Sequence, residues 1–285
     1  MEIFKSIILG IIQGLTEFFP VSSSAHLVIF PYFFNWEGTT LFFAVTLHFA
    51  TLLSLLSVLY RDVINIIKAF FKGIFIKNSR KDANFRFSLC IVIALIPAGI
   101  FGFLFNETIE NIFSVPIYSA VFLIITAFIL ILFEFFGEKQ EKEYITKTGK
   151  NKHINYLIAL VTGLGQAIAI LPGISRSGIT ISTSRIFGIK REEAVKFSFL
   201  ISIPVIFGSF ILEFYDTIKQ YTVGNISFDN SVILSIIVGF IFAYTTGFFA
   251  VKFLMKYSVN KNLNFFAVYC ILISVTFFIV YFIRK

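Results

Sequence analysis

The 285-residue chain is 57% hydrophobic and only 14% charged, with a net charge of +8 and a mean hydropathy of +0.88. This composition excludes an ordinary soluble domain and indicates an integral membrane protein. The positive charge does not indicate a nucleic-acid partner, because the basic residues fall in the segments between apolar runs. Residues 1–20 contain one Lys and no convincing cleavage site, so we expect mature protein there rather than a signal peptide.

Six windows of the sequence contain no Asp, Glu, Lys or Arg over about the length that a helix needs to cross a bilayer. Their length and their lack of two-residue alternation argue against a porin-type barrel and predict an all-α protein with six transmembrane helices. Cys90 and Cys270 lie inside two windows, so we expect buried thiols rather than a disulfide or a metal site. The windows are 41–60, 87–105, 115–133, 197–212, 230–251 and 263–283, and the fourth is extended by its amphipathic flanks.

A polar stretch, QGLTEFFPVSSSAHL at 13–27, precedes the first window. Within it, Glu17 follows an apolar run. A carboxylate embedded in a membrane is rare and usually functional, although an interfacial Glu solvated by headgroups is an alternative. His26 lies three residues after Ser23, which places both on one side of a helical turn; alone, it would more often be a satisfied buried histidine. Ser22 or Ser23 is suited to capping the next helix, and capping accounts for only one of the three serines.

The basic residues indicate which connections face the cytoplasm. Segments 61–86 and 137–153 are rich in Lys and Arg, whereas the loop 106–114 between them has neither. Cytoplasmic loops carry the excess of Lys and Arg, so both basic segments are expected in the cytoplasm, the second as a solvated linker. His48 lies in an apolar helix and is expected to be a packed polar residue, and His153 a loop residue.

The second half of the chain repeats features of the first at a nearly constant offset. GLGQAIAILPGISRSGITIS at 163–182 is the counterpart of the opening stretch, and each half continues into three apolar windows. An odd number of crossings predicts an inverted repeat, an architecture found in transporters. We expect one membrane domain, with repeat one at 1–136, the linker at 137–153 and repeat two at 154–285. The matching positions are Gly10 and Gly163, Gln13 and Gln166, Pro20 and Pro172, and Ser23 and Ser175.

The polar segment of each half is expected to be a re-entrant helical hairpin. If both segments return to their starting side, Lys and Arg gather more strongly on one face than if the second segment crosses once. The first hairpin then enters from outside and the second from the cytoplasm, so that their tips, marked by Pro20 and Pro172, meet near mid-membrane. Broken backbone at that depth is tolerated only where protein buries it or water lines it, which implies a polar cavity.

The heptapeptide PGISRSG, which ends at Gly178, has the residue types of an anion site. Its glycines permit close backbone approach, and the amides that open the next helix, with Ser175 and Ser177, can hold an anion. Arg176 offers a planar set of donors suited to phosphate oxygens. At mid-membrane it needs an anionic partner, either a ligand or Glu17, and in the second case the pair would only lock the hairpins together. These groups suit phosphoryl transfer, and a lipid-facing cavity suggests a phosphate carried by a lipid.

With these motifs, the whole chain resembles the undecaprenyl-diphosphate phosphatase family, the bacitracin-resistance membrane enzymes of bacterial cell-wall synthesis. The resemblance is carried by Gln13 and Glu17 running into FFPVSSSAHL, and by PGISRSGIT, which fits the pattern PGxSRSGxT. It implies removal of the terminal phosphate from undecaprenyl diphosphate at the outer face of the bacterial cytoplasmic membrane. A divalent cation, Mg²⁺ or Ca²⁺, is implied as cofactor, and the reaction recycles the lipid carrier for peptidoglycan synthesis and confers bacitracin resistance.

The resemblance also implies roles for residues of both motifs. Many members of the family carry Glu at the position of Gln13, whose amide contributes no charge, so metal or base duty falls on Glu17 alone. The implied catalytic group is Glu17, Ser23, His26 and Arg176; the implied substrate-binding set is Gln13, Ser22, Gly173, Ser175, Ser177 and Thr180; and Glu17 is the implied metal ligand.

Two mechanisms fit these residues. Either Ser23 attacks the terminal phosphorus while His26 or Glu17 accepts its proton, or one of these two groups activates water and Ser23 only binds phosphate. A second class of function is a transporter that carries a polyprenyl phosphate across the bilayer through the same architecture. The expected partners are a polyprenyl diphosphate and membrane lipids, with no nucleic acid, and a homodimer is left open.

Overall fold

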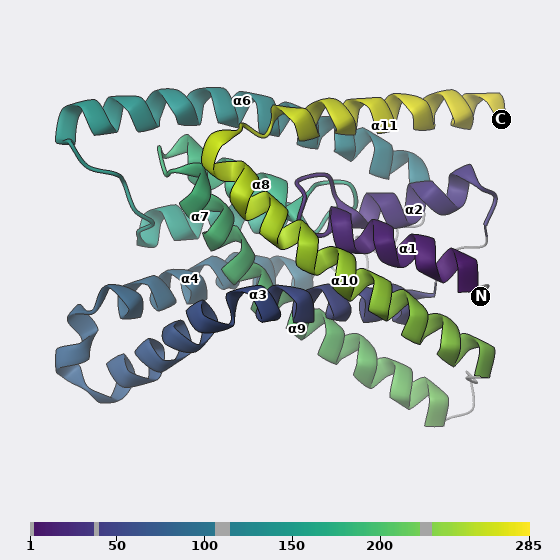
Figure 1. Cartoon of the computed structure of the whole chain (residues 1–285), viewed down its shortest axis with the longest axis horizontal. Helices are drawn as coiled ribbons and strands as arrows, with labels where there is room; N and C mark the ends of the chain where they lie inside the picture. The colour runs from purple at the N-terminus through teal and green to yellow at the C-terminus, as the bar shows by residue number, and fades with distance from the viewer. Residues whose placement is uncertain (1–2, 37–39, 106–114, 223–229) are drawn as a thin grey trace.

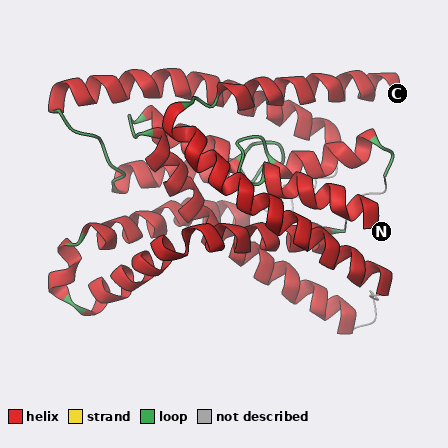
Figure 2. Ribbon diagram, viewed as in Figure 1, coloured by secondary structure: helices red, strands yellow, loops and turns green. Residues whose placement is uncertain are grey.

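The computed structural model describes residues 3–36, 40–105, 115–222 and 230–285 (Figure 1). These residues fold into helices, with no strand among them (Figure 2). The loop 106–114, which the sequence marks as free of basic residues, lies outside the described part. The helices are α1 (Ile3–Thr16), α2 (Ser23–Phe33), α3 (Leu41–Phe75), the short 3₁₀ helix η1 (Lys77–Lys81), α4 (Ala83–Leu104), α6 (Pro116–Thr148), α7 (Tyr156–Ile168), α8 (Arg176–Ile186), α9 (Arg191–Thr222), α10 (Asn230–Asn260) and α11 (Asn264–Ile283).

Six of the described helices, α3, α4, α6, α9, α10 and α11, are long and apolar enough to cross a membrane, which confirms the prediction. Most of them run past the apolar windows read from the sequence. Lys, Arg and Glu are good helix formers, so a charged residue that ends a membrane-compatible window does not end the helix. The backbone of α3 departs from helical angles at Leu59 (φ −102°, ψ 16°), where the first apolar window ends.

The segment expected as a linker, 137–153, is helical over most of its length, because α6 continues to Thr148. Pairs of opposite charge four residues apart support this extension. Lys142 Nζ lies 2.7 Å from Glu138 Oε1, and Lys147 Nζ lies 2.6 Å from Glu143 Oε1. With Glu on the N-terminal side, such pairs stabilise an exposed helix by about 0.2–0.5 kcal/mol each.

The short helices come in two pairs: α1 and α2 precede the long helix α3, and α7 and α8 lie between the long helices α6 and α9 in the chain. α1 packs mainly against α10 and α7 mainly against α4, so each pair lies against a long helix from the other half of the chain. In Figure 1, α1 and α2 lie toward the end of the molecule that carries both termini, and α7 lies toward the opposite end. Within the described residues, each half thus has two short helices followed by three long ones. The inverted repeat and the re-entrant placement of the pairs stay predictions.

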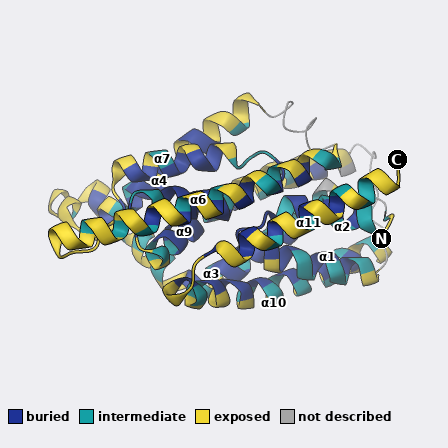
Figure 3. Ribbon diagram, turned by 90° about the horizontal axis from the view of Figure 1, so that it is seen from above, coloured by how far each residue is buried: buried dark blue, intermediate teal, exposed yellow. Residues whose placement is uncertain are grey.

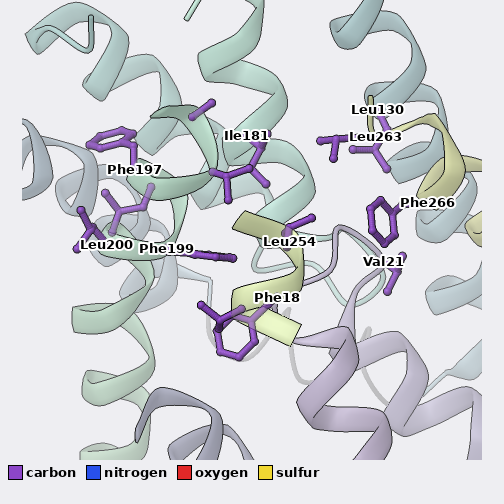
Figure 4. Close-up of a cluster of buried hydrophobic side chains, with 14 of the residues drawn as sticks. Phe18, Val21, Leu130, Ile181, Phe197, Phe199, Leu200, Leu254, Leu263 and Phe266 are labelled. Atoms are coloured by element: carbon purple, nitrogen blue, oxygen red, sulfur yellow. The ribbon is translucent and has the colours of Figure 1, made fainter. Parts of the chain in front are cut away.

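The core lies where the turns after α1 and α7 approach the long helices. Phe18 packs edge-on against Phe199 of α9, with ring centroids 5.5 Å apart, and Figure 4 shows them with Leu254 of α10 and Ile181 of α8. The outer faces of the long helices are apolar as well and are exposed in Figure 3. Apolar side chains on both sides of a helix are expected of a protein whose solvent is lipid.

A buried ion network fixes the end of α8. Arg185, with a fully buried side chain, places Nη1 2.5 Å from Glu141 Oε2 and 2.6 Å from the Ile189 carbonyl oxygen. Glu134 of α6 accepts from Arg191 Nε at 2.5 Å and lies 3.4 Å from Arg185 Nη2. Removal of one partner from such a network leaves a buried charge uncompensated, so the network holds α8 firmly against α6.

The close approach of α1 to α10 generates a stability prediction. A Cβ on Gly14 would lie 2.6 Å from the Ala243 carbonyl oxygen and 2.7 Å from the Gly247 amide nitrogen, both backbone atoms. Gly14→Ala should therefore lower the free energy of unfolding by about 1–3 kcal/mol, as overpacking does. Gly99→Ala is the matched control, because nothing lies within 4 Å of its Cβ. Thermal unfolding of the purified proteins in detergent measures both, and equal midpoints would contradict this packing.

Candidate active site

The first turn of the site breaks the chain between α1 and α2. α1 ends at Thr16 and α2 begins at Ser23, so Glu17 lies in the break. Ser22 caps α2, since its hydroxyl oxygen accepts a hydrogen bond from the Ala25 amide at 3.4 Å. Its φ of 65° is in the left-handed region, which costs a residue with a side chain about 1–3 kcal/mol and persists only where neighbouring contacts enforce it.

The second turn, between α7 and α8, is held by α6. Gly173 has a φ of 108°, and a Cβ there would lie 2.5 Å from the Ser119 carbonyl oxygen, so the position requires glycine. Thr126 Oγ1 donates to the Gly173 carbonyl oxygen and accepts from the Ser175 amide, both at 3.0 Å. Ser175 in turn caps α8 by accepting from the Gly178 amide at 3.0 Å. Thr126 lies inside an apolar window, where the sequence does not show what it contacts.

The two turns contact each other directly. Ser177 Oγ donates to the Phe19 carbonyl oxygen at 3.0 Å, and Arg176 Nη2 lies 2.5 Å from Glu17 Oε1. Glu17 is only 6% exposed, so this ion pair is largely withdrawn from solvent. The pair that the sequence offered as an alternative to ligand binding is therefore present in the structure.

The other carboxylate oxygen of Glu17 gathers three further groups. Gln13 Nε2, Ser23 Oγ and His48 Nδ1 each lie 2.8 Å from Glu17 Oε2. An ionised carboxylate only accepts hydrogen bonds, so the Ser23 hydroxyl donates to it. This geometry is the one required of a carboxylate that takes the proton of a serine nucleophile.

His48 belongs to this cluster, which corrects the expectation that it is only a packed polar residue of α3. Its Nδ1 lies 2.9 Å from Gln13 Nε2 as well as 2.8 Å from Glu17 Oε2. The sequence indicated a role for His48 only by placing a polar residue within an apolar window. Which face of α3 carries it, and what lies opposite, depend on how α3 packs in the fold.

His26 has different partners from those that its spacing to Ser23 predicted. Its Nδ1 lies 2.7 Å from the Ser22 carbonyl oxygen and its Nε2 lies 2.8 Å from the Tyr269 hydroxyl of α11. The two rings stack with an interplanar angle of 5°. Helical side chains point toward the helix N-terminus, so His26 reaches back to the carbonyl before α2. Both ring nitrogens are thus engaged away from the Ser23 hydroxyl, and Tyr269 was not singled out from the sequence.

The hydroxyls expected to bind substrate hold the turns together in this structure. Ser175 and Ser177 Oγ atoms lie 3.2 Å apart, and Ser22 Oγ lies 3.1 Å from Ser24 Oγ. Thr180 Oγ1 donates to the Arg176 carbonyl oxygen at 2.7 Å and lies 2.6 Å from Ser198 Oγ. Ser175, Ser177 and Thr180 belong to the same turn and helix as Arg176, whereas Ser22 belongs to the first turn. Each hydroxyl can exchange its present bond for one to a phosphate oxygen.

The cluster contains oxygen atoms of the kind that bind a divalent cation. Within the described residues, no group of three or more His, Cys, Asp or Glu side chains is arranged to hold a metal. The Glu17 carboxylate is nevertheless present, and the buried Gln13 Oε1 atom has no hydrogen-bond partner. Mg²⁺ is commonly held by one or two carboxylates together with substrate phosphates, so these residues fit a cation that shares its coordination with a substrate.

Comparison with known proteins places the chain in a family. The sequence model of the family described as Bacitracin resistance protein BacA matches residues 6–276. A protein of Thermodesulfovibrio yellowstonii named Undecaprenyl-diphosphatase is 42% identical over 100% of this chain and 99% of its own length. Proteins of the same name from Thermosipho africanus and Methanococcus vannielii are 40% and 39% identical, over 96% and 98% of this chain and 98% and 100% of their own lengths. A match of this extent shows that the chain belongs to the BacA family of bacitracin resistance proteins.

Proposed function

We propose that this protein hydrolyses undecaprenyl diphosphate to undecaprenyl phosphate and inorganic phosphate. The contact that carries the proposal is the Glu17 carboxylate, which lies 2.8 Å from the Ser23 hydroxyl and 2.5 Å from the Arg176 guanidinium. Glu17, the candidate base, thus contacts both the candidate nucleophile, Ser23, and the candidate phosphate-binding group, Arg176. The full-length relatives named Undecaprenyl-diphosphatase support the same reaction and do not favour the alternative of a lipid transporter.

In this proposal, Arg176 and the amides that open α8 bind the diphosphate. Ser23 Oγ attacks the terminal phosphorus, its proton passes to Glu17, and the bond to the bridging oxygen breaks to release undecaprenyl phosphate. Water then attacks the phosphoserine, whose oxygen leaves with the proton held by Glu17, and the phosphate product keeps the hydrogens of the water. Glu17 is the better candidate base than His26, because the Ser23 hydroxyl already donates to it.

A divalent cation, Mg²⁺ or Ca²⁺, held by Glu17 and Gln13 Oε1 would neutralise charge on the phosphate oxygens. The proposal also includes a location: the bacterial cytoplasmic membrane, with the site open to the outer face. The distribution of basic residues supports this orientation, since 61–86 and 137–153 carry the excess of Lys and Arg that marks cytoplasmic segments.

An apolar cavity beside the site suits the polyprenyl chain of the substrate. Its volume is about 380 Å³, and Phe19, which lines it, is two residues from Glu17. A lipid chain lying there would place its diphosphate near the carboxylate. The cavity lies between the end of α1, α10 and the start of α11, and its lining residues are Leu15, Phe19, Phe249, Ala250, Phe253, Phe265 and Phe266.

Phosphate release tests the activity itself. Purified protein in detergent, given polyprenyl diphosphate, should release phosphate, and a chelator should suppress the release. Arg176→Ala should lose on the order of 10³-fold in turnover, because the group that stabilises transferring charge is gone. Arg61→Ala is the matched control, since it removes an exposed arginine of α3. No release by folded wild-type protein, across chain lengths and metals, would favour the transporter instead.

The role of Ser23 is tested against its neighbour Ser24, whose hydroxyl lies 3.1 Å from Ser22 Oγ. Ser23→Ala should lose about 10³-fold or more in turnover, as expected on removal of a nucleophile, whereas Ser24→Ala should retain most of it. Acid quenching during turnover, followed by mass spectrometry, should find phosphoserine at position 23. Oxygen exchange consistent with one in-line displacement, and no covalent species, would show that Ser23 only binds phosphate.

The cavity generates a prediction about chain length. Phe253→Ala removes an aromatic ring from the cavity wall. The lost packing contacts with the lipid chain are worth about 0.1–0.2 kcal/mol each, so KM for undecaprenyl diphosphate should rise about two- to fivefold. KM for a short-chain diphosphate that does not fill the cavity should change less. Phe207→Ala, on the exposed face of α9, is the control. Equal effects of Phe253→Ala on long and short substrates would exclude this cavity as the chain site.

A further inference from the structure

Three polar atoms of the site form a nearly equilateral triangle. Glu17 Oε2 lies 2.8 Å from His48 Nδ1 and 2.8 Å from Gln13 Nε2, and these two nitrogens lie 2.9 Å apart. The three side chains come from α1, from the break after it and from α3. Three ligands on one face of an octahedral cation with bonds of about 2.1 Å lie about 3 Å from one another. The triangle therefore has nearly the dimensions of such a face.

Hydrogen bonds cannot satisfy all three sides of this triangle. If His48 Nδ1 carries a proton and donates it to Glu17, then two donors, this N–H group and the Gln13 amide, face each other. If it accepts from Gln13, its lone pair faces the lone pairs of the Glu17 oxygen. Each tautomer of His48 thus leaves one side with two like groups in contact. A cation above the plane of the triangle, bonded to all three corners, removes this conflict, because it requires a lone pair from every corner.

The amide of Gln13 is compatible with that arrangement. Its Oε1 atom is buried and has no hydrogen-bond partner, which for an acceptor costs about 1–3 kcal/mol. Which end of an amide is oxygen follows from the surrounding hydrogen bonds, and a half-turn about the last side-chain bond exchanges the two ends. In the turned position, the unpartnered oxygen becomes the third corner of the triangle.

We propose that Gln13, Glu17 and His48 bind a divalent cation together, with His48 Nδ1 as a ligand. The imidazole supplies the third donor that a site with a single carboxylate lacks. A mixed set of nitrogen and oxygen donors also accepts first-row transition ions such as Mn²⁺, which can therefore replace the cation as a spectroscopic probe. The remaining positions of the cation stay open for water or phosphate oxygens. Its role in hydrolysis rests on the proposed function, but the binding of the cation does not.

Mn²⁺ alone, added to the full-length protein in detergent without a polyhistidine tag, is the probe. The chain has three histidines, His26, His48 and His153. Electron paramagnetic resonance measures bound Mn²⁺, and electron spin echo modulation reports imidazole nitrogen bonded to it. Wild-type protein should show this modulation, and labelling with ¹⁵N-histidine should change its frequencies. His48→Gln should abolish it and weaken Mn²⁺ binding more than about tenfold, whereas His26→Gln and His153→Gln should retain it.

Failure of wild-type protein to bind Mn²⁺, or binding without nitrogen modulation, would overturn the proposal. Modulation that persists in His48→Gln would do the same. The labelled wild-type protein keeps the test decisive if a variant misfolds. Because no substrate is present, the result is independent of phosphate release: a metal site without hydrolysis would reject the proposed function only, and hydrolysis without the His48 signature would reject this inference only.

Discussion

The ion pair between Glu17 and Arg176 is the interaction on which the rest of the site depends. It joins the turn after α1 to the first residue of α8, which are 159 positions apart in the chain. A charge buried in a protein surrounded by lipid is costly unless an opposite charge neutralises it. The pair ties the two turns to each other, and a chain with two short helix pairs therefore forms one site.

The packing around the turns keeps that contact in place. Broken helices leave backbone groups without intrahelical partners, and in a membrane these groups need partners within the protein. Ser22 and Ser175 supply caps at the start of α2 and α8, and Thr126 satisfies both a carbonyl and an amide of the second turn. α1 on α10 and α7 on α4 then clamp each turn from the opposite half of the chain. The cluster around Glu17 is thus preorganised by elements that do no chemistry.

The six long helices could be predicted from the sequence, because an uncharged apolar run of membrane length is compatible with few structures other than a transmembrane helix. The predicted ends of several helices were too early. Sequence reasoning also identified residues that the fold brings together, Glu17, Ser23 and Arg176, since a charge in an apolar run requires a partner. It did not find the environment of His48, because the face of an apolar helix that meets a distant turn is set only by packing. For His26, spacing along α2 did not give its partners, the Ser22 carbonyl oxygen and the Tyr269 hydroxyl of α11.

The charges of the site explain how it could accept both a diphosphate and a cation. Arg176 has five N–H donors, and Nη2 serves Glu17, so the remaining donors can take phosphate oxygens without loss of the ion pair. With His48 neutral, Glu17 and Arg176 cancel, and an incoming diphosphate meets no net negative charge. A second carboxylate at position 13 would add a negative charge to the site, which a bound cation would have to balance. Gln13 and His48 supply donors without adding negative charge, so among the described residues of this cluster Glu17 alone provides a carboxylate.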